Sequence, residues 1–268
     1  MRVQIVSEPG SPTRANEDLA MAQPNRLLVL DGLTERTESG CVHGVVWYVN
    51  ALGGAIMRQS DSLTLREVLG AAINDTADLH SSTCDLSHPG TPAAAVGLVQ
   101  LVDHRLSYLI LGDVTVVLRA GDKADVVTDD RLLRVNEALH SAVPVPPGAD
   151  SSERQAGLIR RKHAELAVRN KEGGYWVAAA DADVAGQAVT GSRDSAEIRQ
   201  LAVLTDGASR VVEPFGLTDW WGLMDTLAAE GPDAVVGRVR AAEASDPIGH
   251  RWPRNKPSDD ATVVYWER

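Results

Sequence analysis

Cysteine is scarce in this sequence, with Cys41 and Cys84 the only two among 268 residues. Two cysteines are too few for a disulfide framework and too few for a zinc site, so we expect a reduced protein in which both pack as small apolar side chains. Long apolar runs are absent as well, because no stretch reaches the roughly 18 residues that a membrane helix needs. The N-terminal segment MRVQIVSEPG has no apolar block followed by a cleavage site, so it does not predict a signal peptide. We therefore expect a cytoplasmic protein with no membrane partner.

Basic residues are also in short supply, with 26 against 37 acidic ones and a net charge of −11. Nucleic-acid binders hold phosphate backbones with basic surfaces, so we expect no nucleic-acid partner. The acidic surplus is compatible with an enzyme that gathers carboxylates around a cation, although solvated carboxylates also promote solubility alone. Hydrophobic residues make up 44% of the chain, enough for a core. The proline-rich stretch 141–152 is typical of a surface loop, so we expect a single domain over residues 1–268.

Apolar patterning predicts a mixture of strands and helices. Strands are predicted at residues 2–6, 26–31, 93–102, 106–111, 114–119, 175–180, 201–205 and 261–266. The three consecutive runs from 93 to 119 predict an antiparallel meander. Helical spacing predicts helices at residues 43–58, 64–79, 151–169, 218–230 and 232–244. Because strands and helices do not alternate regularly, an α+β layered sandwich is favoured over a doubly wound sheet.

Two of the predicted strands end in the same way. The run LVLDGLT places Asp31 and Gly32 after apolar residues, and AVLTDGAS does the same with Asp206. Other acids follow apolar runs or lie in adjacent turns: Glu17 and Asp18 in RANEDLA, Asp113 in LILGDVT, and Asp259 and Asp260 in KPSDDATVV. An Asp-Gly pair is an ordinary turn former, which is the simplest interpretation of any single one. The recurrence at several strand ends favours a shared purpose.

Carboxylates that gather at neighbouring strand ends repel one another until a cation neutralises them. Mg²⁺ and Mn²⁺ prefer oxygen ligands, and one acid shared by two such ions about 3.5–4 Å apart makes a site for phosphoryl chemistry. A glycine after the acid lets the backbone approach the ion closely and expose a carbonyl oxygen. If the strands are neighbours, the sequence predicts a divalent-metal site.

The ordered set ANED, LVLDG, LGD, LTDGAS and DDATVV resembles the metal-dependent serine/threonine phosphatases of the type 2C class, the PPM family. Each motif is short, but the resemblance extends over nearly the whole chain, from about Arg14 to Trp266. It implies a four-layer αββα sandwich with two central, mainly antiparallel β-sheets. It also implies a centre of two Mn²⁺ or Mg²⁺ ions, with a weaker third, at one edge of the sandwich. A metal-activated water would attack phosphorus there without a covalent phosphoenzyme.

The resemblance also implies, position by position, the metal ligands Glu17, Asp18, Asp31, Gly32, Asp113, Asp206 and Asp259. The implied catalytic set consists of Asp31 as the bridging ligand with Asp206 and Asp259 as terminal ligands. Gly32 would offer its backbone carbonyl, and the early pair Glu17 and Asp18 would act directly or through water. The weaker third ion would lie at Asp113.

The residues expected to handle the phosphate depart from the family pattern. Leu33 follows the first Asp-Gly pair, where a glycine-rich segment with His or Met is usual. His43, ten residues later, is the candidate general acid, and the alternative is that it lies at the start of the next helix. Arg14 is the candidate phosphate clamp, but it stands four residues before Asp18 instead of five, so a surface position is the alternative.

Three further features bear on the site. Val114 replaces a typical serine beside the third-ion aspartate, and Asp260 replaces the usual asparagine after the last metal ligand. The basic trio at 160–162 lies on a predicted helix, where a solvated face is the simple interpretation and a patch that steers phosphopeptides is the alternative.

The leading hypothesis is a Mn²⁺- or Mg²⁺-dependent phosphomonoester hydrolase that acts on phosphoserine or phosphothreonine in proteins. Its partners would be a phosphoprotein substrate and a cognate serine/threonine kinase in a signalling pair. One alternative is a regulatory protein of the same fold that binds a phosphoprotein with weak or no catalysis, as the changes at Arg14 and Leu33 suggest. Another keeps the metal centre and hydrolyses a small phosphorylated metabolite, because the TERTESGCVHG loop is unusual.

Overall fold

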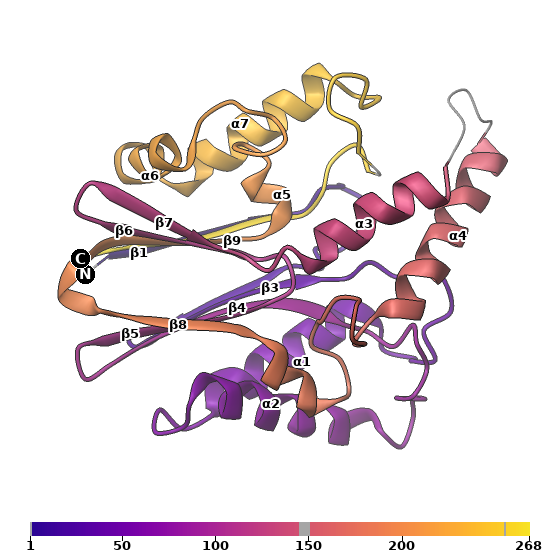
Figure 1. Ribbon diagram of the computed structural model, residues 1–268, viewed down its shortest axis with the longest axis horizontal. Helices are drawn as coiled ribbons and strands as arrows, with labels where there is room; N and C mark the ends of the chain where they lie inside the picture. Colours follow the sequence, from indigo (N-terminus) through magenta and orange to yellow (C-terminus); the bar gives the residue numbers. More distant parts are fainter. Residues whose placement is uncertain (1, 145–150, 255) are drawn as a thin grey trace.

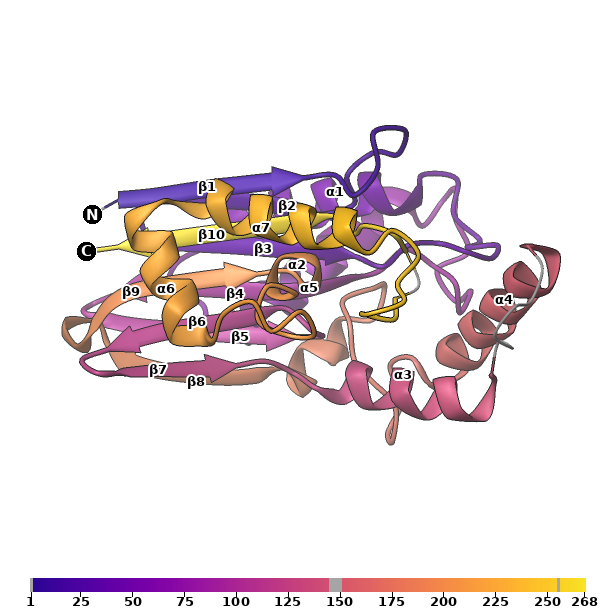
Figure 2. The same ribbon diagram turned by 90° about the horizontal axis from the view of Figure 1, so that it is seen from above.

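The computed structural model describes residues 2–144, 151–254 and 256–268, and contains two five-stranded antiparallel sheets packed face to face (Figures 1 and 2). The first sheet has the order β1 (Arg2–Glu8), β10 (Ala261–Glu267), β9 (Ile198–Leu204), β6 (Thr115–Ala120), β7 (Lys123–Val127). The second has the order β2 (Leu19–Gln23), β3 (Arg26–Gly32), β4 (Ala94–Val102), β5 (Arg105–Leu111), β8 (Val189–Asp194). The surface loop predicted at 141–152 includes residues 145–150, which lie outside the described residues.

Helices cover the outer face of each sheet and complete four layers (Figure 1). The second sheet is covered by α1 (Gly44–Arg58) and α2 (Leu65–His80), and the first by α5 (Asp206–Ser209), α6 (Trp220–Ala229) and α7 (Pro232–Ser245). Two more helices stand at one end of the sandwich, α3 (Arg131–Ala142) and α4 (Ser151–Val168). Short 3₁₀ helices are η1 (Ala182–Gln187) and η2 (Ser195–Glu197). The predicted α+β fold, a four-layer αββα sandwich, is confirmed.

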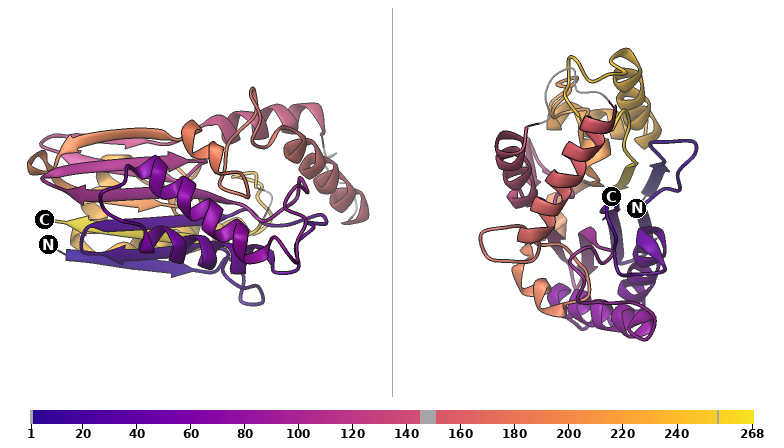
Figure 3. Two further views of the ribbon diagram at one scale, coloured as in Figure 1. Left: turned by 90° about the horizontal axis from the view of Figure 1, so that it is seen from below. Right: turned by 90° about the vertical axis from the view of Figure 1, so that its right-hand side faces the viewer.

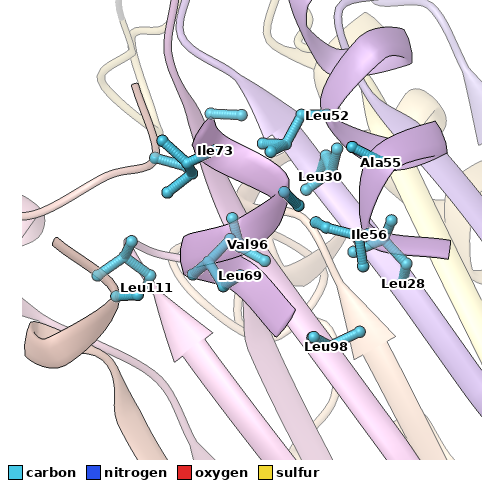
Figure 4. Packing of buried hydrophobic residues seen from close by; sticks show 14 of the residues in the cluster. Leu28, Leu30, Leu52, Ala55, Ile56, Leu69, Ile73, Val96, Leu98 and Leu111 are labelled. Carbon is cyan, nitrogen blue, oxygen red and sulfur yellow. The ribbon is translucent and has the colours of Figure 1, made fainter. Parts of the chain in front are cut away.

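The core is divided into layers by the two sheets. One cluster lies between the sheets, and two others lie between each sheet and its helices. Figure 4 shows the packing of α1 and α2 on the second sheet through Leu28, Leu30, Leu52, Ala55, Ile56, Leu69, Ile73, Val96, Leu98 and Leu111. Successive residues of a central strand face different clusters, so the middle of such a strand is apolar on both sides. This is why the strands that end in acids appear as continuous apolar runs.

The predicted meander is wrong at its third strand. β4 and β5 form the expected hairpin, with Asp103 and His104 at positive φ in its turn. β6 instead pairs with β9 and β7 in the other sheet. The chain changes sheets after Gly112, whose φ of +86° favours glycine and whose Cβ would lie 2.6 Å from Ala95 Cβ. Local patterning identifies a strand but not the sheet to which it belongs.

The other differences concern polar or marginal segments. Residues 175–180 form no strand, and Ala178 makes only an isolated bridge to Ala94. Three strands, β2, β7 and β8, were not predicted; each lies at the edge of a sheet, where one side is solvated and the apolar signal is weak. α3 was also missed, since Leu132 is the one residue that it buries. Within the described ranges, no helix has both the length and the apolar character needed to cross a bilayer.

Candidate metal centre

The acid-bearing segments meet at the end of the sandwich where α3 and α4 stand (Figure 3). Asp31 near the end of β3, Asp206 just after β9 and Asp259 just before β10 line one cavity of about 190 Å³. Asp113, from the turn between β5 and β6, lines the same cavity. Because β3 belongs to one sheet and β9 and β10 to the other, the cavity opens between the ends of the two sheets. The convergence on which the metal hypothesis depends is therefore present.

The glycine that follows each acid is required by the close approach of another acid-bearing segment. The Gly32 amide donates to the Glu17 carbonyl at 3.1 Å, and a Cβ on Gly32 would collide with that carbonyl. A Cβ on Gly207 would collide with the carbonyl of Asp260. The Asp-Gly pairs thus mark places where two backbones touch, which a side chain would prevent. The role of the Gly32 carbonyl as a metal ligand stays a prediction.

Asp18 joins the two sheets behind the cavity. It is buried just before β2, and its Oδ2 accepts a hydrogen bond of 3.0 Å from Thr205 Oγ1 at the end of β9. Burial raises the pKa of Asp18 to about 8, with Asp260 and Asp206 adding repulsion, although hydrogen bonds from Thr262 and Thr205 oppose the shift. The second sheet is therefore fastened to the first by a carboxyl that is costly to ionise.

Asp260 has a structural reason to be an acid. Its two carboxylate oxygens accept hydrogen bonds of 2.7 Å from the backbone amides of Gly10 and Glu17, and so hold the loop before β2 in place. Two amides require two acceptors, which a carboxylate supplies and an asparagine amide does not. Glu17 is not among the residues that line the cavity, and its own carboxylate accepts a hydrogen bond from Thr34.

Burial and mutual repulsion raise the pKa of the acids in the cavity. For Asp31 the pKa rises well above its usual value, through burial first and then repulsion from Asp18 and Asp206. For Asp113 it rises to about 7, through burial and then repulsion from Asp206. The pKa of Asp206 is raised by burial and Asp259, with Arg210 opposing. Asp31 and Asp113 have no ion pair in the described structure, and Asp206 has only Arg210 at 3.9 Å, so a divalent cation would supply the missing positive charge.

Asp259 differs from the other acids because two basic side chains hold it. Lys256 Nζ lies 2.6 Å from its Oδ1, and Arg210 Nη2 lies 2.9 Å from its Oδ2. Burial alone would lower the pKa of Lys256, but Asp259 and Asp31 outweigh it and raise the pKa. Sequence reasoning missed both partners. The sequence features that could have indicated them are a lysine three residues before Asp259 and an arginine four residues after Asp206.

The donor set fits a hard divalent cation that keeps part of its water shell. No three acids in the described part of the chain bring one oxygen each within 4.8 Å of one another, so a cation would contact few carboxylates directly. Mg²⁺ tolerates this, since it commonly binds one or two carboxylates and retains several waters. Asp31, Asp113 and Asp206 would hold the ion, because they line the cavity and burial and neighbouring carboxylates raise their pKa values, although Arg210 lies 3.9 Å from Asp206.

The part of the cavity lining formed by α3, α4 and the loop after β3 is called here the basic wall. It carries three basic side chains, Arg36, Arg161 and Lys162, and one acid, Glu165. Lys162 pairs with Glu165 at 2.8 Å, and Arg161 Nε donates to the Val143 carbonyl at 2.7 Å. Arg36 has no ion pair or side-chain hydrogen bond among the described residues. Positive charge facing the acids across a cavity suits a phosphate that lies between a cation and this wall.

Two predicted phosphate-handling residues lie outside the cavity. Arg14 is exposed and is not among the lining residues, which matches its surface alternative. His43 occupies the N-cap position of α1 and stacks on Trp47 with ring centroids 4.4 Å apart, so its helix-start alternative is confirmed. A different histidine, His140 on α3, lines the cavity. It went unnoticed in the sequence because α3 itself was not predicted.

Comparison with solved structures was made over the whole chain. Stp1 from Staphylococcus aureus, a serine/threonine phosphatase, matches 99% of this chain and 94% of its own, with a TM-score of 0.60 and 12% identity. PppA, a key regulatory component of T6SS in Pseudomonas aeruginosa, matches 100% and 97%, with a TM-score of 0.59 and 14% identity. The catalytic domain of the phosphatase PstP, in complex with two manganese ions, matches 98% and 96%, with a TM-score of 0.55 and 15% identity.

The chain has the PPM phosphatase fold. No protein-family model and no curated protein matches its sequence. At these identities the likeness establishes the architecture alone. Any catalytic activity of this chain depends on the residues of its own cavity.

Proposed function

We propose that this chain is a phosphomonoester hydrolase that uses Mn²⁺ or Mg²⁺ and acts on phosphoserine or phosphothreonine in proteins. The observation that carries the proposal is the cavity in which Asp31, Asp113 and Asp206 face a basic wall. Carboxylates alone would repel a phosphate, and basic residues alone would only bind it. The combination suits a substrate that bridges a bound cation and the wall.

Each part of the cavity has a task in this proposal. When bound, a divalent cation would stabilise negative charge on the phosphoryl oxygens and acidify water. Asp31 and Asp206 would hold the cation, while Arg36 and Lys162 would orient the phosphate from the opposite wall. His140 is the candidate proton donor to the leaving oxygen; its Nδ1 lies 2.7 Å from the Asn136 carbonyl, so Nε2 is the nitrogen available for proton transfer.

The test measures hydrolysis of an aryl phosphate by the purified chain with Mn²⁺, with Mg²⁺ and with a chelator. We expect hydrolysis with either ion, none with the chelator, and loss of activity in Asp206→Asn. A panel of phosphoserine and phosphothreonine peptides is then compared with small phosphorylated metabolites. Preference for the peptides supports a phosphoprotein as the substrate. Preference for metabolites would replace that substrate class and keep the chemistry.

A second function is favoured by one observation, the pairing of Asp259 with Lys256 and Arg210. Two resident positive charges next to the acids reduce the attraction for a metal, as expected of a regulatory protein that binds a phosphoprotein without hydrolysing it. Calorimetry with Mn²⁺ separates the two functions. Absence of binding at millimolar Mn²⁺, together with retention of a phosphopeptide, would replace the hydrolase proposal with this one.

A further inference from the structure

A second cluster of potential ligands lies where the loop after β3 meets the end of α2. Cys41 comes from this loop, His80 is the last residue of α2, and Cys84 closes the turn that follows. Cys84 Sγ lies 2.9 Å from Cys41 Sγ, which in turn lies 3.5 Å from His80 Nδ1. In the described part of the chain, this is the one group of three such residues whose ligand atoms all lie within 4.8 Å. None of the three lines the acidic cavity.

The prediction that both cysteines pack as small apolar side chains is wrong. Both are half-buried free thiols, neither belongs to the apolar clusters, and they contact each other and His80. Counting cysteines alone also overlooked the histidine four residues before Cys84, which supplies a third ligand.

The His80 ring is buried with incomplete hydrogen bonding. Its residue is 1% exposed, Nδ1 faces the Cys41 thiol, and Nε2 has no partner among the described residues. A buried polar atom without a hydrogen-bond partner is unfavourable. Nδ1, which faces the Cys41 thiol, is the nitrogen positioned to coordinate a cation, and Nε2 would then carry the ring proton.

The backbone holds the three ligands in position. The amides of Thr83 and Cys84 donate to the His80 carbonyl at 3.1 and 3.0 Å, which fixes the turn that brings Cys84 back beside His80. Three residues separate this pair, a spacing that zinc ligand pairs commonly have. On the other side, the Asp85 amide donates to the Gly40 carbonyl at 2.8 Å and places Cys41 against the same turn.

We propose that Cys41, His80 and Cys84 bind one thiophilic divalent cation of the Zn²⁺ type, with water in the fourth position. Two thiolates and an imidazole form a ligand set that tetrahedral Zn²⁺ accepts. With Zn–S bonds of about 2.3 Å, two thiolates lie about 3.7 Å apart, so the sulfur atoms need to separate by about 0.8 Å. A disulfide, at about 2.05 Å, needs a shift of similar size but leaves the buried His80 without a role.

Such an ion would fasten the loop at residues 33–43 to the end of α2. The same loop contributes Thr34 and Arg36 to the acidic cavity. The ion would therefore limit the motion of the segment that carries Arg36, which is otherwise without an ion pair in the described structure.

The test uses the full-length chain, reduced and then freed of reductant, with Co²⁺ as the probe. Tetrahedral Co²⁺ bound to thiolates gives strong charge-transfer absorption, which oxygen ligands do not give. Because the chain has only two cysteines, any such band arises from Cys41 or Cys84. We expect one equivalent of Co²⁺ to saturate the band, Zn²⁺ to displace it, and Cys41→Ser and Cys84→Ser each to abolish it.

Matched variants separate this site from the rest of the molecule. His80→Asn is expected to weaken Co²⁺ binding at least about tenfold, while His104→Asn, in the β4–β5 turn, leaves it unchanged. Asp206→Asn should keep the band, because it alters only the acidic cavity. Zn²⁺ should raise the Tm of the wild-type chain but not of a folded Cys41→Ser variant. Absence of a thiolate band in the reduced chain, or recovery of the two cysteines only as a disulfide, overturns the proposal.

Discussion

Asp31 and Asp259 line the same cavity from opposite sheets, yet their surroundings differ. Asp31 lies among Asp18, Asp113 and Asp206, whose repulsion adds to burial in raising its pKa. Both oxygens of Asp259 are instead held by Lys256 and Arg210. These two aspartates occupy comparable positions at strand ends, but one is surrounded by negative charge and the other is paired with positive charge. Asp31 has no ion pair in the described structure, whereas Asp259 has two.

The difference shows that convergence of acids is not enough to define a metal centre. The side of the cavity around Asp31 requires a cation or protons to be stable, whereas the Asp259 side is neutralised by the protein itself. We therefore expect the cation to be held mainly from the Asp31 side, with Lys256 competing for the space beside it.

The largest effect should come from removing the charge of Asp31. Asp31→Asn is expected to abolish Mn²⁺ binding in calorimetry and to reduce phosphate-ester hydrolysis about 1000-fold, because a lost metal contact removes several kcal/mol of transition-state stabilisation. Asp225→Asn makes the same change at an exposed position on α6 and should alter neither quantity. Normal Mn²⁺ binding by Asp31→Asn would contradict the expectation that the cation is held mainly from the Asp31 side.

A smaller effect is expected from pH in the metal-free protein. Because burial raises the pKa of Asp18 to about 8 and of Asp113 to about 7, the folded chain binds more protons than the unfolded chain above about pH 4. Stability is therefore greatest at acidic pH and is lost as pH rises through these values. Urea unfolding should show a free energy of unfolding about 5 kcal/mol lower at pH 8.5 than at pH 5.5, of which Asp18 contributes the larger part.

The same experiment with Asp18→Asn identifies the groups responsible. This variant removes one titrating group and should flatten the pH dependence, and saturating Mn²⁺ should flatten it in the wild-type chain. An unchanged slope in Asp18→Asn would assign the loss of stability at high pH to other residues.

The role of Lys256 is tested by removing its charge. Lys256→Ala is expected to tighten Mn²⁺ binding about tenfold, because a cation that contacts Asp259 at 2.6 Å no longer opposes the ion. Calorimetry measures this independently of activity. Lys123→Ala, at the exposed start of β7, is the matched control and should leave the affinity unchanged. Weaker binding in Lys256→Ala would mean that the lysine positions Asp259 as a ligand.

The smallest effect concerns the basic wall. Arg36→Ala is expected to raise KM about fivefold with little change in kcat, since it removes a partly screened charge that would contact the phosphate. Arg14→Ala is the matched control, because Arg14 is exposed outside the cavity. If Arg14→Ala had the larger effect, the phosphate clamp implied by the family resemblance would replace the one inferred from the cavity.

Much of the fold could be predicted because central strands contain continuous apolar runs. The runs LLVL of β3 and LAVL of β9 are buried at every position, so their apolar pattern is visible without tertiary information. β7 and β8 could not be found in this way, since edge strands retain polar residues. The meander failed at β6 for another reason: an apolar strand fits either sheet, and Gly112 directs it into the other one.

The acids of the candidate site were accessible to sequence reasoning, but their partners were not. Asp-Gly pairs after apolar runs indicated where carboxylates gather. Lys256 and Arg210 carry no motif, and their effect depends on both reaching Asp259 from different segments. His140 belongs to α3, which was not predicted. Arg161 belongs to the basic trio noted at 160–162, but only the tertiary structure shows that it lines the cavity.

The sequence by itself determined the strands with their terminal acids, since burial on two faces and the need for glycine at close backbone contacts are local requirements. Only the tertiary structure decided which acids stay uncompensated, which are paired with a basic residue, and that two distant cysteines meet a buried histidine. The physical reason is that electrostatic interactions depend on distance and burial, and both are set when segments far apart in the chain pack together.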